Sequence, residues 1–288
     1  MSVSSFTTAA SLDDALAALA AGARPVAGGT DLVVGARSGK STLPASIVAI
    51  HRIAELHAVS HADGALRLGA LASHEELAAS DDVRSRFTAL ADACAIVGSH
   101  ATRAQGTIGG NVMNASPAME TGGPLVCFGA TATLQSATGS REIAVADLWT
   151  GPGATTAADD ELLVGLTLPT PADGTGSAYL RLEYRRQMEI AVVGATAVVT
   201  VAGGAVTEAR IAMTALSPTI RRVPEAESAL AGSDGGPAAI AAAGAAVAAA
   251  ATPISDVRGS AEYRRAMAAV IARRAIENAL ARARGEEG

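Results

Sequence analysis

The pattern of apolar and polar positions divides the chain into three regions of mixed helix and strand. In residues 1–62, Ser11 and Asp14 form a capping box ahead of an apolar helical stripe, which Gly22 ends. A bend at residues 62–64 closes this region, which we predict to be a small βαβ-like lobe. Its expected elements are a helix between Ser11 and Gly22, a strand at 25–27, a helix at 30–36 and a strand at 46–51.

Residues 63–172 are predicted to form a second lobe of the α+β class. An alternating strand at 65–71 is followed by a helix that Ser73 and Glu76 cap, and the apolar period then predicts one long helix from 82 to about 97. Further strands are expected at 130–135, 142–145 and 162–168, the first two joined by a turn at 138–140.

Residues 173–288 are predicted to form a three-stranded antiparallel sheet with helices. The composition of residues 171–177 is typical of a linker. Strands are expected at 180–185, 191–201 and 206–215, with a hairpin at Gly203-Gly204, and the alanine-rich run 238–251 is expected to be helical. A last helix at 260–284 has an apolar face formed by Tyr263, Met267, Val270 and Ile271.

Two glycine pairs, each beside a threonine, lie far apart in the sequence. The first turn reads Ala27-Gly28-Gly29-Thr30-Asp31 and the second reads Thr107-Ile108-Gly109-Gly110-Asn111. Consecutive backbone N–H groups can wrap a phosphate oxygen only where no Cβ blocks the approach, and a helix N-terminus adds a favourable dipole. Either turn alone is more often a simple bend, but the two together predict a site for a diphosphate. No Gly-x-Gly-x-x-Gly follows a predicted strand, which argues against a doubly wound dinucleotide fold.

The second turn lies in residues 101–117, which read ATRAQGTIGGNVMNASP. With the first turn, this run resembles the FAD-binding medium subunit of the molybdenum hydroxylases, the group that contains xanthine dehydrogenase, aldehyde oxidase and carbon monoxide dehydrogenase. The resemblance extends through ELLVGLTLP at 161–169 and YLRLEYRRQMEIA at 179–191. It implies an α+β fold, with a two-lobed PCMH-type FAD-binding region followed by an antiparallel sheet with helices, and FAD as the cofactor.

The resemblance also implies which residues approach FAD. Glu120 stands where the family usually has an aspartate that contacts the sugar part of FAD, and Arg181 stands where xanthine dehydrogenases have a lysine near the flavin. Leu163 aligns with a position that touches the isoalloxazine ring, and Arg181 can equally be read as a solvated strand arginine. The segment assigned to the pyrophosphate and adjoining groups is Arg24, Pro25, Val26, Ala27, Gly28, Gly29, Thr30 and Asp31; Thr107, Gly110 and Asn111 would face it, and Val97, Gly98, Thr102 and Gly106 either approach the cofactor or serve as core and turn residues.

Composition and charge limit the kinds of partner that the chain is expected to bind. The chain has 288 residues, 49% of them hydrophobic and 17% charged, which is typical of a globular protein of about two domains. Its formal net charge is −6 and no basic stripe runs along it, so nucleic acid and anionic lipid are not expected partners. The start lacks a signal-peptide pattern and residues 238–251 are too short and too weakly apolar to span a bilayer, so we expect a cytoplasmic protein without membrane insertion.

Cysteine and histidine usage indicates no metal site. A [2Fe–2S] cluster normally takes four thiolates, and the chain has only Cys94 and Cys127, which are better read as buried small apolar residues. The five histidines lack the spacing of metal ligands. The glycine turns hold no acid–base constellation, so no catalytic side chain is expected and the flavin would carry the chemistry.

The resemblance therefore implies partner subunits. A [2Fe–2S] small subunit and a molybdenum-cofactor large subunit would pass electrons to FAD in a dimer of heterotrimers, a heterohexamer, and an external acceptor (NAD, a quinone, a carrier protein or oxygen) would take them. Glu189-Ile190-Ala191 lacks the tyrosine of the carbon monoxide type, which favours an organic substrate. Two alternatives stay open: a self-sufficient flavoprotein with Glu183, Tyr184 or Glu189 as proton donor or acceptor, and a non-enzymatic nucleotide-binding module.

Overall fold

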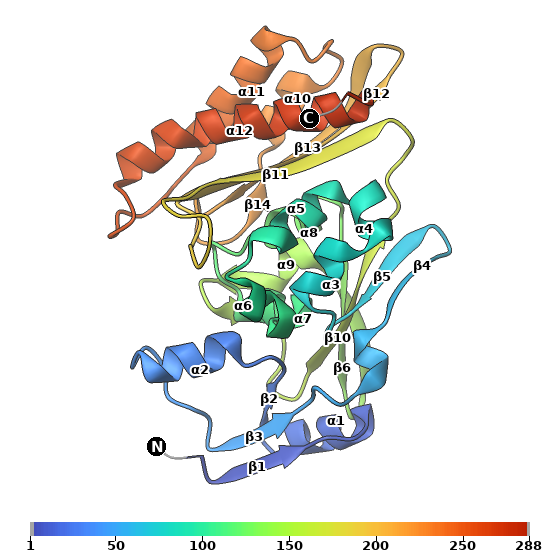
Figure 1. Ribbon diagram of the computed structural model, residues 1–288, viewed down its shortest axis with the longest axis vertical. Coiled ribbons are helices and arrows are strands. Elements are labelled where there is room, and N and C mark those ends of the chain that lie inside the picture. The colour runs from blue at the N-terminus through green and yellow to red at the C-terminus, as the bar shows by residue number, and fades with distance from the viewer. Residues whose placement is uncertain (1–2, 287–288) are drawn as a thin grey trace.

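The computed structural model describes residues 3–286, so Met1 and Ser2 of the predicted first lobe and residues 287–288 of the third region lie outside the described residues. Besides a two-stranded sheet within residues 149–155, three sheets follow one another along the long axis of the molecule (Figure 1). A three-stranded parallel sheet lies at one end, a five-stranded antiparallel sheet in the middle and a four-stranded antiparallel sheet at the other end. The α+β class is confirmed.

The first lobe is a parallel sheet with two helices. Its elements are β1 (Ser5–Thr8), α1 (Leu12–Ala20), β2 (Arg24–Val26), α2 (Thr30–Arg37), β3 (Ser46–Ala49) and the 3-10 helix η1 (Ala54–His57). The capping box of α1 is confirmed, because Ser11 Oγ accepts from the amide of Asp14 and Asp14 Oδ2 accepts from the amide of Ser11, both at 3.1 Å. The pattern missed β1, whose four residues are all exposed and which pairs in parallel with β3.

The second lobe carries the middle sheet, in the order β4-β5-β10-β6-β7, with its helices on one side (Figure 1). Its β4 falls within residues 1–62 but hydrogen-bonds to β5, so the boundary of the first lobe stays a proposal. The elements are β4 (Val59–Ala62), β5 (Ala65–Gly69), α3 (His74–Ala79), α4 (Asp81–Arg86), α5 (Thr88–Ile96), α6 (His100–Gln105), α7 (Ile108–Asn114), α8 (Gly122–Cys127), β6 (Thr131–Ser136), β7 (Gly139–Ala144), α9 (Val145–Leu148), β8 (Trp149–Gly151), β9 (Ala154–Thr155) and β10 (Leu162–Pro169).

The single long helix predicted from 82 to 97 is wrong. Phe87 separates α4 from α5 with φ −119° and ψ 45°, outside the helical region. Its ring is fully buried and meets Phe128 edge to face, with 5.0 Å between the ring centroids. Burying this aromatic pair outweighs the local preference for a continuous helix.

The third region is an antiparallel sheet covered by helices on its outer face (Figure 1). The sheet has a fourth, two-residue strand besides the three predicted, and the Gly203-Gly204 hairpin is confirmed, since both glycines have positive φ. The elements are β11 (Thr175–Leu182), β12 (Val193–Ala202), β13 (Ala205–Thr214), β14 (Arg221–Arg222), α10 (Pro224–Leu230), α11 (Pro237–Ala250) and α12 (Ala261–Ala283).

The predicted linker at 171–177 and the apolar face of α12 both need correction. β11 begins at Thr175, and Ser177 is buried with its hydroxyl accepting from the amide of Ala89 at 3.0 Å. Tyr263 is 42% exposed, and the face of α12 that packs on the sheet consists mainly of alanines with Ile271, Ile276 and Leu280. A Cβ at Gly176 of β11 would overlap the backbone of α12 at Ala279 and Ala283, so the helix lies directly on the strand.

Two ion-paired residues fix the third region to the second lobe. Arg282 of α12 donates to Asp92 Oδ2 of α5 and to the carbonyl oxygen of Ser177, both at 2.6 Å. The same carboxylate accepts from the amide of Tyr179 at 3.2 Å. This clamp joins α5, β11 and α12.

Candidate functional site

The first glycine turn leads from β2 into α2. Gly29 is the N-cap of α2 and has φ +68°, a left-handed conformation that favours glycine. A Cβ at Gly28 would overlap the backbone carbonyl oxygen of Gln105, at the end of α6. The absence of a side chain at Gly28 therefore lets the first lobe touch the second at this point.

The backbone amides of this turn are free. Within residues 3–286, the N–H groups from Gly28 to Leu32 have no hydrogen-bond acceptor. The last three belong to the first turn of α2, where no intrahelical carbonyl is in reach. Five successive donors beside a left-handed glycine form a nest that fits an anion such as a phosphate.

In the second glycine turn, the amides from Ile108 to Asn111 donate to acceptors within the protein. Those of Ile108 and Gly109 donate to the carbonyl oxygens of Ala72 and Ala70, both at 2.9 Å. Thr107 caps α7, because its Oγ1 accepts from the amide of Gly110 at 3.0 Å and its carbonyl oxygen from that of Asn111 at 2.9 Å. Within residues 3–286 only the amide of Thr107 has no acceptor in this turn, so the expectation that its glycine amides would bind phosphate is wrong, and the turn otherwise offers side chains.

The two glycines of the second turn differ. A Cβ at Gly109 would lie 2.6 Å from the carbonyl oxygen of Ala70, so Gly109 serves close packing. Gly110 is exposed, and a Cβ there would meet only Thr107 Oγ1, at 2.9 Å. Asn111 is half-buried, and its Oδ1 accepts from the hydroxyl of Thr121 at 2.6 Å; its side-chain NH₂ group has no acceptor within residues 3–286 and so can donate to a ligand.

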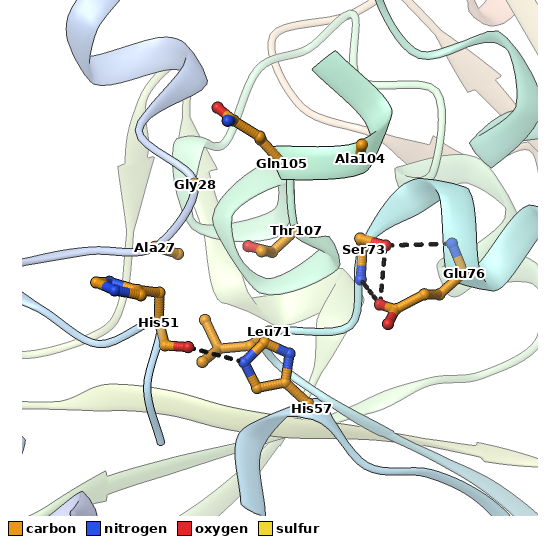
Figure 2. A pocket seen from close by; sticks show the side chains of 10 residues that line it. All are labelled: Ala27, Gly28, His51, His57, Leu71, Ser73, Glu76, Ala104, Gln105 and Thr107. Atoms are coloured by element: carbon orange, nitrogen blue, oxygen red, sulfur yellow. Dashed lines mark hydrogen bonds between the residues drawn. The ribbon is translucent and has the colours of Figure 1, made fainter. Parts of the chain in front are cut away.

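A cavity of about 390 Å³ lies between the two lobes (Figure 2). The predicted residues that line it are Ala27, Gly28 and Thr107. Sequence reasoning missed the others: His51, His57, Leu71, Ser73, Glu76, Ala104 and Gln105. Of these, Ser73 and Glu76 were recognised only as a helix cap, and the capping box is the one signal that could have drawn attention to them.

Polar groups surround this cavity. Glu76 Oε2 accepts from both the amide and the hydroxyl of Ser73, each at 2.8 Å, as Figure 2 shows. His57 Nε2 lies 3.1 Å from the carbonyl oxygen of His51. The cavity thus presents a carboxylate from the second lobe and two imidazoles from the first lobe, with His51 beside Ala27 (Figure 2).

The residues around α6 occupy the junction with the third region. Gly98 has φ +52°, and its carbonyl oxygen accepts from the amide of Met188 at 2.8 Å. Thr102 Oγ1 lies 3.7 Å from Met188 Sδ, and Val97 ends α5 just before this contact. These three predicted residues therefore lie together under the loop between β11 and β12.

Gly106 lies close to both turns. Its carbonyl oxygen accepts from the amide of His74 at 3.1 Å, and a Cβ there would lie 3.6 Å from Thr30 Oγ1 and 3.3 Å from the His74 ring. Burial, together with the neighbouring Arg103 guanidinium, lowers the pKa of His74 from 6.5 to about 4. A neutral imidazole therefore supports the approach to the second turn.

Glu120 and Arg181 pair with each other. Arg181 Nη1 lies 2.5 Å from Glu120 Oε1 and Arg181 Nε lies 2.7 Å from Glu183 Oε2. The Arg181 side chain is 1% exposed, so the reading of a solvated strand arginine is wrong. Burial raises the pKa of Glu120 to about 7, although the Arg181 charge opposes the rise.

The remaining predicted residues are spread around the first turn and the middle sheet. Arg24 is exposed and pairs with Asp159 at 2.7 Å, while Pro25 and Val26 are half-buried in β2. Partial burial raises the pKa of Asp31, opposed by Lys40. Leu163 is buried beside the bulge of β10, so any contact it makes with a ligand would run through its backbone.

Metal-ligating groups do not gather in the described part of the chain. Residues 3–286 contain no group of three or more His, Cys, Asp or Glu side chains that could hold an ion. Cys94 and Cys127 are buried thiols, and burial raises the pKa of both. In the same residues, no helix is both long and apolar enough to cross a membrane.

Comparison with known proteins covers nearly the whole chain. Residues 2–171 match the family described as the FAD binding domain in molybdopterin dehydrogenase, and residues 177–279 match the CO dehydrogenase flavoprotein C-terminal domain. The carbon monoxide dehydrogenase medium chain of Afipia carboxidovorans is 32% identical over 262 residues, which cover 91% of this chain and 90% of that one. The xanthine dehydrogenase FAD-binding subunit of Escherichia coli O157:H7 is 30% identical over 227 residues, 77% of either chain.

Solved structures agree with these matches. A carbon monoxide dehydrogenase structure from Hydrogenophaga pseudoflava contains a chain that superposes with a TM-score of 0.92 at 30% identity, covering 96% of this chain and 97% of that one. Quinoline 2-oxidoreductase from Pseudomonas putida 86 gives 0.90 at 28% identity, covering 98% and 97%. The likeness extends across all three regions of the molecule.

Proposed function

This chain belongs to the molybdopterin dehydrogenase FAD-binding family, as an FAD-binding subunit of a molybdenum hydroxylase, and we propose that it holds one FAD between its two glycine turns. The observation that supports this proposal is the row of five amides from Gly28 to Leu32, which have no acceptor in the part of the chain that the structure describes and lie at the contact between the lobes, near Thr107. A diphosphate has the charge and the acceptor oxygens that such a nest satisfies.

The two turns divide the work of binding. In the proposal, the first turn donates backbone N–H groups to the pyrophosphate, while the second turn contributes the Thr107 hydroxyl and the free NH₂ group of Asn111. When bound, FAD supplies the redox chemistry, accepting electrons and passing them on. The residues of this chain bind it, orient it and exclude water. Further proposed contacts are Arg24, Pro25, Val26, Ala27, Asp31, Val97, Gly98, Thr102, Gly106, Gly110, Glu120, Leu163 and Arg181.

The chain works with partner subunits, since its relatives are medium chains of multi-subunit dehydrogenases. We propose a [2Fe–2S] subunit and a molybdenum-cofactor subunit, assembled as a dimer of heterotrimers, with an external acceptor that takes electrons from the flavin. An organic substrate, acted on at the partner's molybdenum, is the preferred choice because Ile190 replaces the tyrosine of the carbon monoxide type. The cytoplasmic location stays a prediction.

The alternative of a self-sufficient flavoprotein is disfavoured because its three candidate proton donors or acceptors are already hydrogen-bonded or ion-paired. Tyr184 donates its hydroxyl to the carbonyl oxygen of Arg258 at 2.7 Å, Glu183 pairs with Arg181, and Glu189 pairs with Arg185 at 3.4 Å. Each is engaged within its own region. The non-enzymatic alternative does not fit relatives that are dehydrogenase and hydroxylase subunits.

Two measurements test the proposal. The purified chain should show flavin absorption, and acid precipitation should release FAD from the protein, since binding is expected to be non-covalent. Recovery of FMN, or colour that stays with the pellet, would contradict this. Copurification with an iron–sulfur and a molybdenum subunit should give a complex that reduces an acceptor, while the chain alone should show no substrate-driven flavin reduction.

A further inference from the structure

Glu120 lies where the second lobe meets the third sheet, and only 6% of its surface is exposed. The next residue, Thr121, donates its hydroxyl to Asn111 Oδ1 at 2.6 Å, and Asn111 directly follows the glycine pair of the second turn. Glu120 is therefore one residue away from a hydrogen bond into the proposed cofactor site.

The charges that face Glu120 are unequal in number. Arg181 bridges it to Glu183, and the Arg181 Nη1 group also donates to the carbonyl oxygen of Glu189 at 3.2 Å. The phenol of Tyr179 on β11 and the thiol of Cys94 on α5 are also near, and both stay neutral because burial raises the pKa of each. With both carboxyls ionised, the group carries one excess negative charge, which a single proton on Glu120 removes. Burial favours the neutral arrangement and so raises the pKa of Glu120 to about 7.

A row of unpartnered polar atoms leads away from this pair. Within residues 3–286, four buried side-chain atoms on one face of the third sheet have no hydrogen-bond partner: Tyr179 Oη, Arg181 Nη2, Thr196 Oγ1 and Thr214 Oγ1. Tyr179 lies opposite Thr196, and Gly194 lies opposite both Arg181 and Thr214. A Cβ at Gly194 would lie 2.8 Å from Tyr179 Oη, which places the phenol over the neighbouring strand.

Buried polar groups of this kind normally bind internal water. Chains of such water carry protons between side chains in folded proteins. The interface between α8 and the third sheet thus has the polar lining that a proton path to Glu120 needs.

We propose that Glu120 is a proton-exchanging residue, which takes up one proton when the flavin held by this chain is reduced and releases it when the flavin is reoxidised. The inference rests on the proposed function. Two electrons, one from each of two [2Fe–2S] clusters that are thereby oxidised, reduce FAD, and one proton binds the ring to give the anionic reduced flavin. The second proton binds the ionised Glu120 carboxylate and makes it a neutral acid, so one of the two added negative charges is cancelled on the ring and the other on Glu120.

The test is the pH dependence of the flavin midpoint potential, measured on the FAD-loaded chain with dithionite as reductant and redox dyes as mediators. Above about pH 7, where Glu120 is ionised in the oxidised protein, wild type should take up two protons per two electrons and Glu120→Gln only one. The slope of potential against pH should therefore be twofold steeper in wild type. The reduced-minus-oxidised infrared spectrum of wild type should contain a protonated carboxyl band that Glu120→Gln lacks.

Two further variants keep the test decisive. In wild type the slope of potential against pH should become steeper at about pH 7, where Glu120 ionises in the oxidised protein. Glu183→Gln removes the second carboxylate beside Arg181, so this break in the slope should move to lower pH without being lost. Glu227→Gln is the matched control, because Glu227 is a similarly shielded carboxylate paired with an arginine, Arg222 at 2.7 Å, elsewhere in the third region; its slope should equal that of wild type.

The outcomes separate the two proposals. A Glu120→Gln protein that binds FAD and keeps the wild-type slope overturns the proton-exchange role and leaves the proposed function intact. If Glu120→Gln does not fold or does not bind FAD, an unchanged pH for the change of slope in Glu183→Gln overturns the role instead. A wild-type chain that binds no FAD overturns both.

Discussion

In the first glycine turn, the amides from Gly28 to Leu32 have no acceptor within residues 3–286, whereas in the second turn those from Ile108 to Asn111 all donate to the protein itself. The two turns share Gly-Gly and a neighbouring threonine, yet within residues 3–286 the first leaves five successive amides without an acceptor and the second leaves only that of Thr107. The second is a rigid platform whose side chains face the first. A glycine pair marks a close approach of backbone, and the hydrogen-bond partners decide whether a ligand or the fold makes that approach.

The largest effect should come from filling the contact between the turns. In Gly28→Val, the new side chain would overlap the carbonyl oxygen of Gln105 and push the free amides away from the second lobe. We expect FAD affinity to fall about a thousandfold, about 4 kcal/mol, measured by flavin titration. Gly151→Ala is the control, since a Cβ there meets nothing within 4 Å. Full flavin occupancy in Gly28→Val would show that the first turn does not bind the cofactor.

Acid should lower the stability of the folded protein through His74, which supports the second turn. The pKa of His74 is about 4 in the folded protein against 6.5 for a free imidazole, so the unfolded state binds the proton first as pH falls. Its stabilising contribution is complete above pH 6.5 and decreases as pH falls toward 4, by about 3 kcal/mol in total. Urea unfolding should show this loss in wild type and a smaller one in His74→Gln.

Glu120 has the opposite sign in an overlapping range. Its pKa is raised from 4.5 to about 7 in the folded protein, so its contribution to stability decreases as pH rises between those values. The two groups therefore oppose each other, and the His74 effect has to be measured as a difference between variant and wild type at each pH. Equal acid sensitivity of the two proteins would contradict the assignment to His74.

The adjacent glycines of the second turn should separate folding from binding. Gly109→Ala places a methyl group 2.6 Å from the carbonyl oxygen of Ala70, so we expect a loss of about 2 kcal/mol in the free energy of unfolding. In Gly110→Val the new side chain is exposed and meets only Thr107 Oγ1, a proposed cofactor contact, so we expect FAD affinity to fall about thirtyfold, about 2 kcal/mol, with little change in unfolding. If Gly109→Ala instead lowered FAD affinity and Gly110→Val lowered the free energy of unfolding, the assignment of Gly109 to packing and of Gly110 to the binding face would be wrong.

The smallest effect concerns the cap of α7. Thr107→Val removes the acceptor for the amide of Gly110 and should cost about 1 kcal/mol in the free energy of unfolding. Thr107→Ser keeps the hydroxyl and should stay near wild type. If FAD affinity also drops only in the valine variant, the hydroxyl serves both cap and ligand.

Most elements could be predicted because their signals are local. The capping box at Ser11, the Gly203-Gly204 hairpin and the alternating strands each depend on neighbouring residues. The predictions that failed concern elements whose bounds depend on contacts between residues far apart in the sequence. Phe87 breaks a helix in order to pack on Phe128, and β1 exists only because β3 pairs with it.

The site shows the same division. The resemblance named both glycine turns, but no local pattern reveals that Ala70 and Ala72 already accept the amides of the second one. Nor could the pairing of Glu120 with Arg181 be predicted, because it depends on how the second lobe meets the third sheet. Residues of the cavity such as His51 and Glu76 lie outside both motifs and become neighbours only through the fold.

The direct packing of α12 on Gly176, with Arg282 holding Asp92, sets an order of events during synthesis. Of the described elements, α12 is the last to emerge from the ribosome, so until then β11 and β12 lack the helix that covers them. The nascent third sheet therefore exposes an apolar face, and until α12 is synthesised the carboxylate of Asp92 lacks its partner, Arg282. This interval is the one in which a chaperone or a misplaced neighbouring chain has access to the subunit.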